Sequence, residues 1–338
     1  MKKNITIKDI AKYCDVSAMT VSRAFRKDSK INPATRKLII QCAADHGYLK
    51  GAKQGRPKNK SLDKKLKRIQ LIFGSQGKNP ALFHTRLLTS LEQQLAKLGC
   101  ECIIRSSTGD YECFVSLLEA AQKSDTYATI ILGNFPDAHL QALLSAFPGA
   151  FLLDNSGVGI HGNTYSSFSF DNSQAAFMGV DYLISMGRKK ILLVNGNKQH
   201  AFANEIFAGY QRALEKNHLA FLENRVLTTD FSADDAAHQF RKYLNHYGKD
   251  SIDAIFTNDE MAVGIYKVMH ENKLKIPEEI AICGCDNLPI GEQLYPELTT
   301  VMLDYDKLVQ MAVEQFKKES FDIVTTKIMP TLLVKKST

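Results

Sequence analysis

The chain has 338 residues, of which 44% are hydrophobic, which excludes global disorder and allows two or three domains. Residues 1–68 contain 19 Lys and Arg against five Asp, a net charge of +14, so the rest carries −7 and only the N-terminal part suits a polyanion. No hydrophobic run reaches about 18 residues, and no hydrophobic core follows the basic start MKKNITIKDI, so we expect a cytoplasmic protein without membrane contact.

The first fifty residues predict three short helices. Thr6 caps the first helix, Ser17 caps a second that extends to Arg26, and Pro33 begins a third. The residues expected to face inward are Ile7, Ile10, Ala11 and Cys14 in the first helix, Val21, Ala24 and Phe25 in the second, and Leu38, Ile39, Cys42 and Ala43 in the third. Because only two or three residues separate the first two helices, the pattern predicts a helix-turn-helix.

A helix-turn-helix places the N-terminal residues of its second helix in the major groove of DNA. Arg23 can read a guanine with two hydrogen bonds, whereas Ala18 and Met19 can make only apolar contacts, for instance with thymine methyl groups. Short hydroxyl side chains nearby suit phosphates. The expected DNA contacts are Thr6, Ser17, Ala18, Met19, Thr20, Ser22, Arg23 and Thr35. The alternative is a small helical bundle with a charged surface.

The segment TIKDIAKYCDVSAMTVSRAFRKDSKINPATRKLIIQCAADHGY resembles the DNA-binding headpiece of the lactose-repressor (LacI/GalR) family. The matching pieces are TIKDIA, the pattern V-S-x-x-T-V-S-R, the start of the third helix and the closing Gly-Tyr, and MTVSR is similar to the gluconate-repressor branch. Asp15 stands where the family usually has glycine. We expect Asp to accept the left-handed conformation there at a cost of about 1 kcal/mol or less.

Residues 50–68, KGAKQGRPKNKSLDKKLKR, contain nine Lys or Arg. In the family this segment forms a hinge helix whose leucine enters the minor groove, but the usual Pro-Asn and Ala-Arg-x-Leu pattern is missing here. A short helix after Ser61 would present Leu62 or Leu66. Arg56 and Lys58, in a Gly-Arg-Pro-Lys sequence, instead resemble an AT-hook that lies in the minor groove. The third reading is a solvated linker with nonspecific phosphate attraction.

From Arg68 onward strands and helices alternate, which predicts parallel sheets covered on both faces. The expected strands are residues 69–73, 100–106, 128–134, 150–154, 189–196, 253–259 and 279–287, with a second half that restarts at 165–170. The predicted fold is an N-terminal all-α helix-turn-helix headpiece plus an α/β core of two doubly wound parallel-sheet subdomains. We expect a headpiece at 1–48, a basic linker at 49–67 and a core at 68–338, with subdomains at about 68–165 and 166–290 and residues 291–338 crossing back.

Two such halves side by side form a cleft, and ligands of these sheets bind beyond the carboxyl ends of the strands. Polar residues follow the expected strands at those ends: Asp154, Asn195, Asn258, Asp259 and Asp286. Each could instead cap a helix, but their recurrence favours a ligand site.

Three segments of this region, which are FDNSQAAFMGVDYLISMGRKKILLVNG, FTNDEMAVGIYKVMHENKLKIPEEIAICGCDN and YPELTTV, resemble the core of the same family, which is similar to periplasmic sugar-binding proteins. The resemblance implies effector contacts at Asp154, Asn258, Asp286, Phe231 and Tyr305, with the two aromatic rings stacked on a sugar. Before Gly209 the family commonly carries an arginine that this chain lacks. With Asn204 in that stretch instead, we expect a neutral sugar or polyol rather than an anion.

The sequence contains no nucleophile elbow, zinc-binding helix or phosphate-binding loop, so we expect no enzyme, no metal and no cofactor. The main hypothesis is a homodimeric repressor that binds a pseudo-palindromic DNA operator under the control of a sugar-like effector. The alternatives are a ligand-independent or architectural DNA-binding protein with a degenerate effector core, a sugar-processing enzyme with an accessory headpiece, and a secreted solute-binding protein, which the missing signal opposes.

Overall fold

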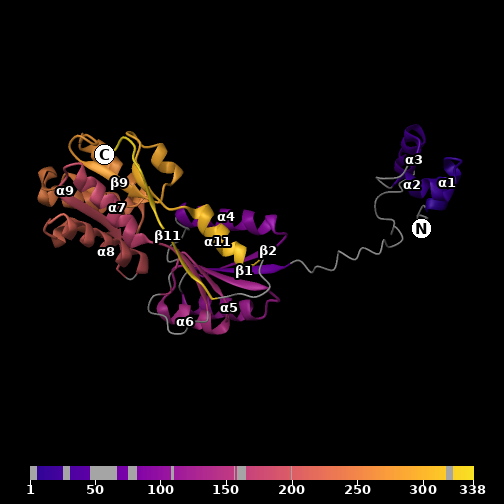
Figure 1. The fold of residues 1–338 in the computed structure, drawn as a ribbon, viewed down its shortest axis with the longest axis horizontal. Helices are drawn as coiled ribbons and strands as arrows, with labels where there is room; N and C mark the ends of the chain where they lie inside the picture. The colour runs from indigo at the N-terminus through magenta and orange to yellow at the C-terminus, as the bar shows by residue number, and fades with distance from the viewer. Residues whose placement is uncertain are drawn as a thin grey trace. The chain divides into compact units, whose positions relative to one another are not determined.

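The computed structural model describes residues 6–25, 31–45, 67–74, 82–107, 110–155, 157, 165–198, 200–316 and 323–338. The chain divides into two compact units, residues 1–65 and 66–338 (Figure 1). We call the first unit the headpiece and the second the core. The strip at 50–66, including Arg56 and Lys58, lies outside the described residues.

The headpiece contains the three predicted helices, which are α1 (Ile7–Tyr13), α2 (Ala18–Ala24) and α3 (Pro33–Asp45). Their shared interior consists of Ile10, Ala11, Val21, Ala24, Ile39 and Ala43. Two predicted inward residues are wrong: Phe25 ends α2 as an exposed C-cap, and Leu38 is 57% exposed. Both lie one position away from the buried stripe, because the helix turns 100° per residue and Ala24 and Ile39 already fill the interior.

Local hydrogen bonds stabilise the start of α1 and the turn between α1 and α2. Thr6 and Asp9 form a reciprocal capping box at the start of α1. Asp15 has φ 48°, so it takes the left-handed conformation expected at the position where the family has glycine. Ala11 is buried where α1 approaches α2, and the Val16 amide donates to its carbonyl at 3.0 Å. Arg36 then ties α3 to α2 by donating to the Ala24 carbonyl at 2.9 Å.

The core contains two six-stranded sheets. The first lobe has the strand order β11-β5-β4-β3-β1-β2, and all of its paired strands are parallel. Its elements are β1 (Arg68–Gly74), α4 (Leu82–Lys97), β2 (Glu101–Ser107), α5 (Tyr111–Gln122), β3 (Ala128–Gly133), α6 (Asp137–Ala146), β4 (Phe151–Leu153), β5 (Ser166–Phe170), α11 (Tyr305–Gln315) and β11 (Thr325–Ile328). Helices α4 and α11 cover one face of this sheet, and α5 and α6 cover the other (Figure 1).

The second lobe repeats this order as β12-β10-β9-β8-β6-β7, with only β12 antiparallel to its neighbour. Its elements are α7 (Asn172–Ser185), β6 (Ile191–Gly196), α8 (Ala201–Lys216), β7 (Val226–Thr229), α9 (Ala233–Tyr247), β8 (Ala254–Phe256), α10 (Asp259–Glu271), β9 (Ala281–Cys285), β10 (Thr299–Met302) and β12 (Thr331–Leu333), with short 3-10 helices at Glu223–Arg225, Lys249–Ser251 and Pro289–Glu292. Both lobes are therefore doubly wound, as predicted. The order in which strands are added to the sheet reverses beside β1 in the first lobe and beside β6 in the second.

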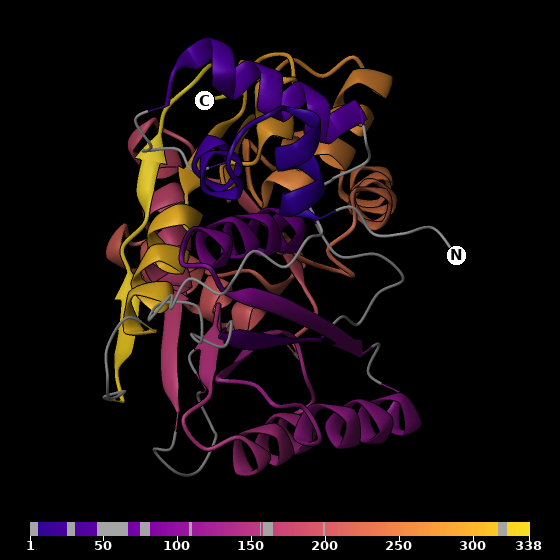
Figure 2. The same ribbon diagram turned by 90° about the vertical axis from the view of Figure 1, so that its right-hand side faces the viewer.

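The change of lobe differs from the expected position. The sequence predicted that the second lobe begins with a strand at residues 165–170. In the structure this strand is β5, and it pairs with β4 in the sheet of the first lobe. The chain changes lobe after Phe170, returns between β10 and α11, and changes again between β11 and β12. The segment that carries β11 and β12 runs along one side of the core and reaches both lobes (Figure 2).

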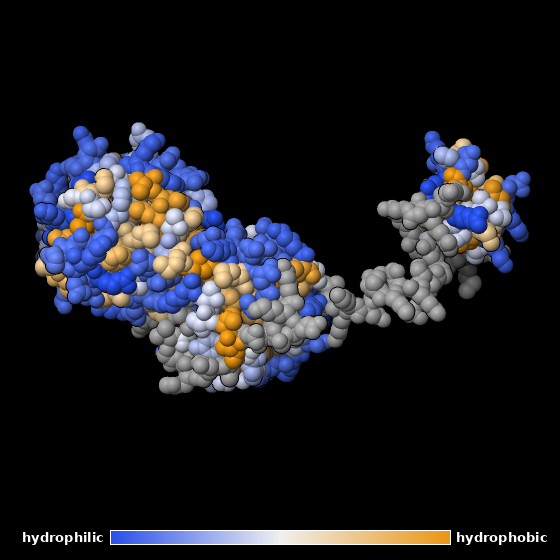
Figure 3. Space-filling view, viewed as in Figure 1, coloured by the Kyte–Doolittle hydropathy of each residue, from blue (hydrophilic) through white to orange (hydrophobic). Residues whose placement is uncertain are grey.

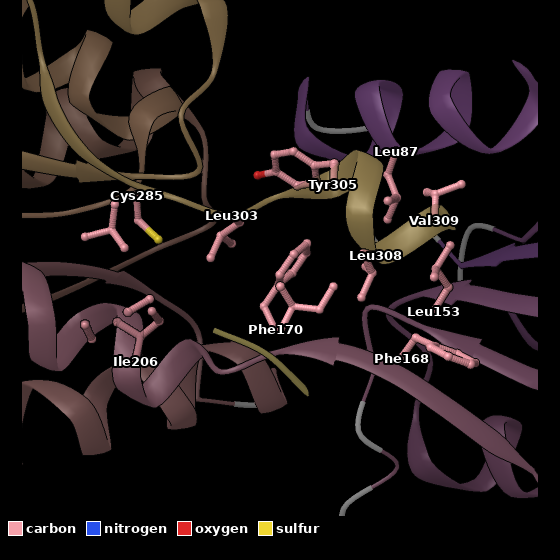
Figure 4. Close-up of a cluster of buried hydrophobic side chains, with 14 of the residues drawn as sticks. Leu87, Leu153, Phe168, Phe170, Ile206, Cys285, Leu303, Tyr305, Leu308 and Val309 are labelled. Carbon is pink, nitrogen blue, oxygen red and sulfur yellow. The ribbon is translucent and has the colours of Figure 1, made fainter. Parts of the chain in front are cut away.

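Apolar packing continues from one lobe to the other. Figure 4 shows Phe168, Phe170 and Leu153 of the first sheet around Leu308 and Val309 of α11. The same buried cluster extends to Ile206, Cys285 and Leu303 in the second lobe. On the face shown in Figure 3, hydrophilic residues cover most of the core surface, and hydrophobic residues gather only in small patches. None of the helices described is long and apolar enough to cross a bilayer.

Candidate DNA interface and effector site

Helix α2 exposes three of the side chains predicted to read DNA. Ala18 and Arg23 are exposed, and Met19 is 64% exposed although it is a large apolar residue. Ser17 and Thr20 stabilise the N-terminus of α2. The Thr20 amide donates to the Ser17 hydroxyl at 3.0 Å, and the two hydroxyls lie 2.8 Å apart. This arrangement leaves the apolar tip and Arg23 as the outward-facing groups of α2.

The remaining predicted DNA contacts lie within α2, at the starts of the other two helices, or outside the described residues. Thr6 is exposed, but its hydroxyl is engaged with Asp9 at 2.6 Å in the capping box. Ser22 and Thr35 are half-buried. The structure therefore tests neither Arg56 nor Lys58, and the hinge-helix, AT-hook and linker interpretations all stay predictions.

In the core, three of the polar residues that follow strands have structural partners. Asn195 is buried and donates to the Ala203 carbonyl at 2.8 Å, which fixes the start of α8. Asn258 caps α10, since the Met261 amide donates to its side-chain oxygen at 2.8 Å. Asp259 is fully buried and accepts from Thr300 and from the Leu288 amide, both at 2.7 Å. Burial is the main cause that raises the Asp259 pKa to about 7.

Two predicted carboxylates lack such partners. Asp286 is 3% exposed, and its Oδ1 has no hydrogen-bond partner in the part of the chain described; the same holds for the hydroxyl of Tyr305, which is 1% exposed. The Tyr305 hydroxyl lies near enough to Asp286 to favour the charged form of this carboxylate and so to lower its pKa. The geometry of the two groups is, however, not that of a hydrogen bond. Burial, and then the charges of Asp259 and Asp154, nevertheless raise the Asp286 pKa well above its usual range. Burial and then Glu205 raise the Asp154 pKa likewise.

Asn204 does not face this group. It is exposed and donates to the Lys198 carbonyl at 2.9 Å, so the prediction that it contacts the effector has no support in this geometry. The next residue, Glu205, lies close enough to Asp154 to interact with its charge. Asn172 donates to Glu205 at 2.8 Å and Lys327 approaches it at 3.6 Å. One residue along a helix changes the direction of the side chain by 100°, which explains the difference.

Contacts between the lobes define what we call the lobe junction, which lies at the carboxyl ends of the strands. Arg86 of α4 donates to the Asn287 carbonyl at 2.8 Å, and the Leu82 amide donates to Glu260 at 3.2 Å. Asn134, which follows β3, hydrogen-bonds to His200, which precedes α8. Burial and then the charge of His200 lower the pKa of His84 to about 4.

The two predicted aromatic contacts occupy different places at the junction. Phe231 is half-buried beside His200, with ring centroids 5.1 Å apart. The Tyr305 ring instead packs edge-on against Phe83 and Phe170, at 5.3 and 5.4 Å between centroids, with the Arg86 guanidinium 5.0 Å from its centre. The expected stacking of Tyr305 on a sugar is therefore wrong for this geometry, because its ring is enclosed. Its hydroxyl points toward the end of β9 that carries Cys285 (Figure 4).

Three of the predicted effector contacts have positive φ, as do Asp15, His218 and Lys273 elsewhere in the chain. Asp154, Phe231 and Asp286 have φ values of 58°, 70° and 113°, and Asn287 follows at 52°. Positive φ is rare for residues other than glycine, and such strain concentrates at functional sites. In contrast, a surface hollow of ≈ 230 Å³ near Lys190, Asp250 and Glu279 lies at the amino ends of the second sheet and includes no predicted contact. Among the residues described, no group of metal-ligating side chains could hold a metal ion.

Two family models match the chain. Residues 6–50 match the model for bacterial regulatory proteins of the lacI family, and residues 180–338 match a periplasmic binding protein-like domain. The chain therefore carries the DNA-binding domain of the lacI family. The more specific likeness of its headpiece to the gluconate-repressor branch stays a prediction.

Relatives of the chain align over nearly its whole length. The NTD biosynthesis operon regulator NtdR of Bacillus subtilis (strain 168) is 28% identical over 309 residues, which cover 91% of this chain and 90% of the relative. A solved complex of the transcriptional regulator CelR with cellobiose has a TM-score of 0.72 at 19% identity and covers 99% and 100%. The lac repressor dimer bound to operator and the anti-inducer ONPF has a TM-score of 0.68 at 22% identity and covers 99% of each chain.

Sequence reasoning missed several residues of the junction. Glu205, His200, His84 and Asn134 meet there from three separate segments, since His200 precedes the helix that carries Glu205. No local pattern marks them, since their role depends on how the two lobes face each other. The nearest available signal was that His200 and Asn134 both follow a strand, as the predicted carboxylates do.

Proposed function

We propose that the chain is a transcriptional repressor whose headpiece binds a DNA operator and whose lobe junction binds a small sugar-like effector. The observation that carries this proposal is the pairing, in one chain, of a helix-turn-helix that exposes Met19 and Arg23 with a lobe junction. At this junction Asp286 and Tyr305 have polar groups without a hydrogen-bond partner among the described residues. Buried polar groups without partners are costly, so a bound ligand or water stabilises them.

The relatives support both halves of the proposal. The lac repressor dimer is described as bound to operator and an anti-inducer, and CelR as bound to cellobiose, a sugar. By analogy, this chain would act as a homodimer on a pseudo-palindromic operator, with one α2 in each half-site. It would act in the cytoplasm, where the DNA is, and we assign no reaction to its core.

Within this proposal, the domain boundaries are 1–48 for the headpiece, 49–67 for the linker and 68–338 for the core. Arg23 would read a guanine, Ala18 and Met19 would contact apolar base edges, and Thr6, Ser17, Thr20, Ser22 and Thr35 would approach phosphates. Asp154, Asp286 and the Tyr305 hydroxyl would bind polar groups of the effector, with Phe231 at the edge of the site. The nitrogen of Asn258 would complete the set, since its oxygen is occupied as a cap.

Effector binding would change DNA affinity through the lobe junction. The two lobes are joined by hydrogen bonds of Arg86, Glu260 and His200. A ligand bound between the lobes would therefore make different contacts if the lobes moved relative to each other. Only such a difference in affinity between two arrangements shifts the balance between them. A degenerate, ligand-free core is less well supported, because it would have no reason to retain the unpartnered Asp286 Oδ1.

The test begins with the purified full chain and selection of bound genomic DNA fragments. We expect one pseudo-palindromic site to be enriched, and we expect a sugar panel to contain a compound that both raises the melting temperature and changes affinity for that site. Equal binding to all DNA, or a site whose affinity ignores every compound that raises the melting temperature, would contradict the proposal.

A further inference from the structure

Among the residues that the structure describes, carboxylates outnumber cations at the lobe junction. Asp154 comes from the end of β4 in the first lobe, and Glu205 and Asp286 come from α8 and the end of β9 in the second. Asp154 interacts electrostatically with each of the other two, and Asp259 and Glu260 add negative charge around Asp286. Five carboxylates from both lobes therefore contribute to one region.

The cations of the described ranges that reach this region are already engaged. Lys327 lies 3.6 Å from Glu205, which is also held by Asn172. Lys335 lowers the pKa of Asp259 but forms its ion pair with Glu292, at 3.7 Å.

Arg86 directs its guanidinium to the Asn287 carbonyl and the Tyr305 ring. The two nearby histidines, His84 and His200, have lowered pKa values because they are buried, so the neutral form of each is favoured.

Asp154 and Asp286 remain unmatched. Within the ranges that the structure describes, neither forms an ion pair, and the buried Oδ1 of Asp286 accepts no hydrogen bond. The enclosed Tyr305 hydroxyl is a second buried group without a partner beside them, and both carboxylates influence its ionisation. A ligand at this point meets two carboxylates from opposite lobes and one phenol.

We propose that the effector presents an ammonium group to Asp154 and Asp286, so that it is an amine-bearing polyol such as an amino sugar rather than a neutral sugar. A hydroxyl donates one hydrogen bond and brings no charge, whereas an ammonium donates three and offsets the negative charge of both lobes. The inference rests on the proposed effector site, and it specifies the chemical class that this site selects.

Proton release on binding follows from this arrangement. In the empty site, burial and neighbouring charges favour the protonated forms of Asp154 and Asp286, whose pKa values are raised. An ammonium favours their charged forms, so binding expels protons into the solvent. Affinity should therefore increase with pH until the amine itself loses its proton, whereas a neutral sugar gives no such increase.

The experiment uses calorimetry on the full chain with matched pairs: glucosamine and glucose, galactosamine and galactose, and Tris and pentaerythritol. We expect the amine member of at least one pair to bind tenfold or more tightly than its neutral partner, a difference of about 1.4 kcal/mol. Repeating the titration at about pH 6 and about pH 7.5, in buffers of different ionisation enthalpy, should reveal proton release for the amine alone.

The variant Asp154→Asn should bring each pair to within about threefold. Asp234→Asn, which removes an exposed carboxylate in α9, is the matched control and should keep the preference. If Asp154→Asn does not fold, as melting would show, the buffer dependence of the unaltered chain decides. Equal or weaker binding of every amine, or no binding of any amine at about 10 mM, overturns the inference. Operator binding is measured separately, so failure of the DNA-binding proposal would be distinguishable.

Discussion

At the scale of single residues, the exposed end of α2 separates the two roles of the headpiece. Ser17 and Thr20 stabilise the start of the helix, while Met19 in its first turn and Arg23 in its last turn are exposed. A guanidinium can form two parallel hydrogen bonds with a guanine, and a thioether cannot, so the two exposed side chains would contribute differently to sequence preference.

Replacing Arg23 with alanine should reduce affinity for the selected operator by about 1–3 kcal/mol and relax preference at one base pair of each half-site. Lys12→Ala removes the same charge from an exposed position on α1 and should weaken binding to all sequences alike. Binding titrations on the operator and on sites with single base-pair substitutions measure both the loss of affinity and the change in base preference. Equal losses for the two variants on every site would contradict base reading by Arg23.

His84 should make the core less stable in acid. Its folded-state pKa is about 4, below the unfolded value of about 6.5, so the unfolded chain takes up more protons as pH falls through this range. The stabilisation is present above about pH 6.5, and roughly 2 kcal/mol of it is lost at about pH 5. The variant His84→Phe keeps an aromatic ring beside Phe73 and Phe83 and should flatten this dependence. Denaturant unfolding at the two pH values tests it, with exposed His246→Gln as the control.

Residue type alone predicted where polar side chains would gather, but not what each would do. Asn258 and Asp286 both follow a strand, yet the first caps α10 and the second has an unpartnered oxygen. The cap of Asn258 depends only on the amide of a residue three positions later in the chain, so it can be predicted from the local sequence. The state of Asp286 depends on Asp154 and Tyr305, which come from other parts of the fold, so it could not be predicted.

At the scale of elements, close helix packing in the second lobe depends on glycine. A Cβ atom on Gly209 of α8 would lie 2.1 Å from the Ser173 carbonyl and 2.9 Å from the Ala176 methyl, both in α7. These separations are far below van der Waals contact, so α7 and α8 approach each other only because the side chain is absent.

Gly209→Ala should therefore lower the free energy of unfolding of the core by roughly 1–3 kcal/mol, despite the better helix propensity of alanine. Ala208→Ser, at the exposed neighbouring position, should change it by less than about 0.5 kcal/mol. Chemical denaturation of both variants measures the difference. A Gly209→Ala chain as stable as the unaltered one would show that α8 can shift without cost.

Element type could be predicted more completely than element pairing. Helix α9, which the sequence analysis omitted, carries readable signals: a Ser232 cap, an apolar stripe ending near Tyr243, and Gly248 with φ 75° after it. The assignment of β5 to the first sheet had no such signal. Its residues are buried in either position, and only its partners β4 and β11 decide the sheet.

At the scale of the whole molecule, each unit has an interior of its own. The headpiece closes around Ile10, Val21 and Ile39, and the core closes around three other apolar clusters. We expect each to fold without the other.

A fragment of residues 66–338 should thus keep the melting temperature of the core and the affinity for any effector within about twofold, while losing operator binding entirely. Calorimetric melting and titration of the fragment beside the full chain provide the comparison. A fragment that unfolds, or that loses effector affinity by more than tenfold, would mean that the headpiece contributes to the core.

The late position of β11 and β12 has a consequence for biosynthesis. Residues 325–328 complete the edge of one sheet and residues 331–333 complete the edge of the other, and the ribosome makes both after every other strand. Neither lobe can gain its full set of backbone hydrogen bonds during translation, so both finish together once this last segment emerges. Between about residue 170 and that moment, the nascent first sheet exposes the β5 edge to other chains, a period in which a chaperone would be most useful.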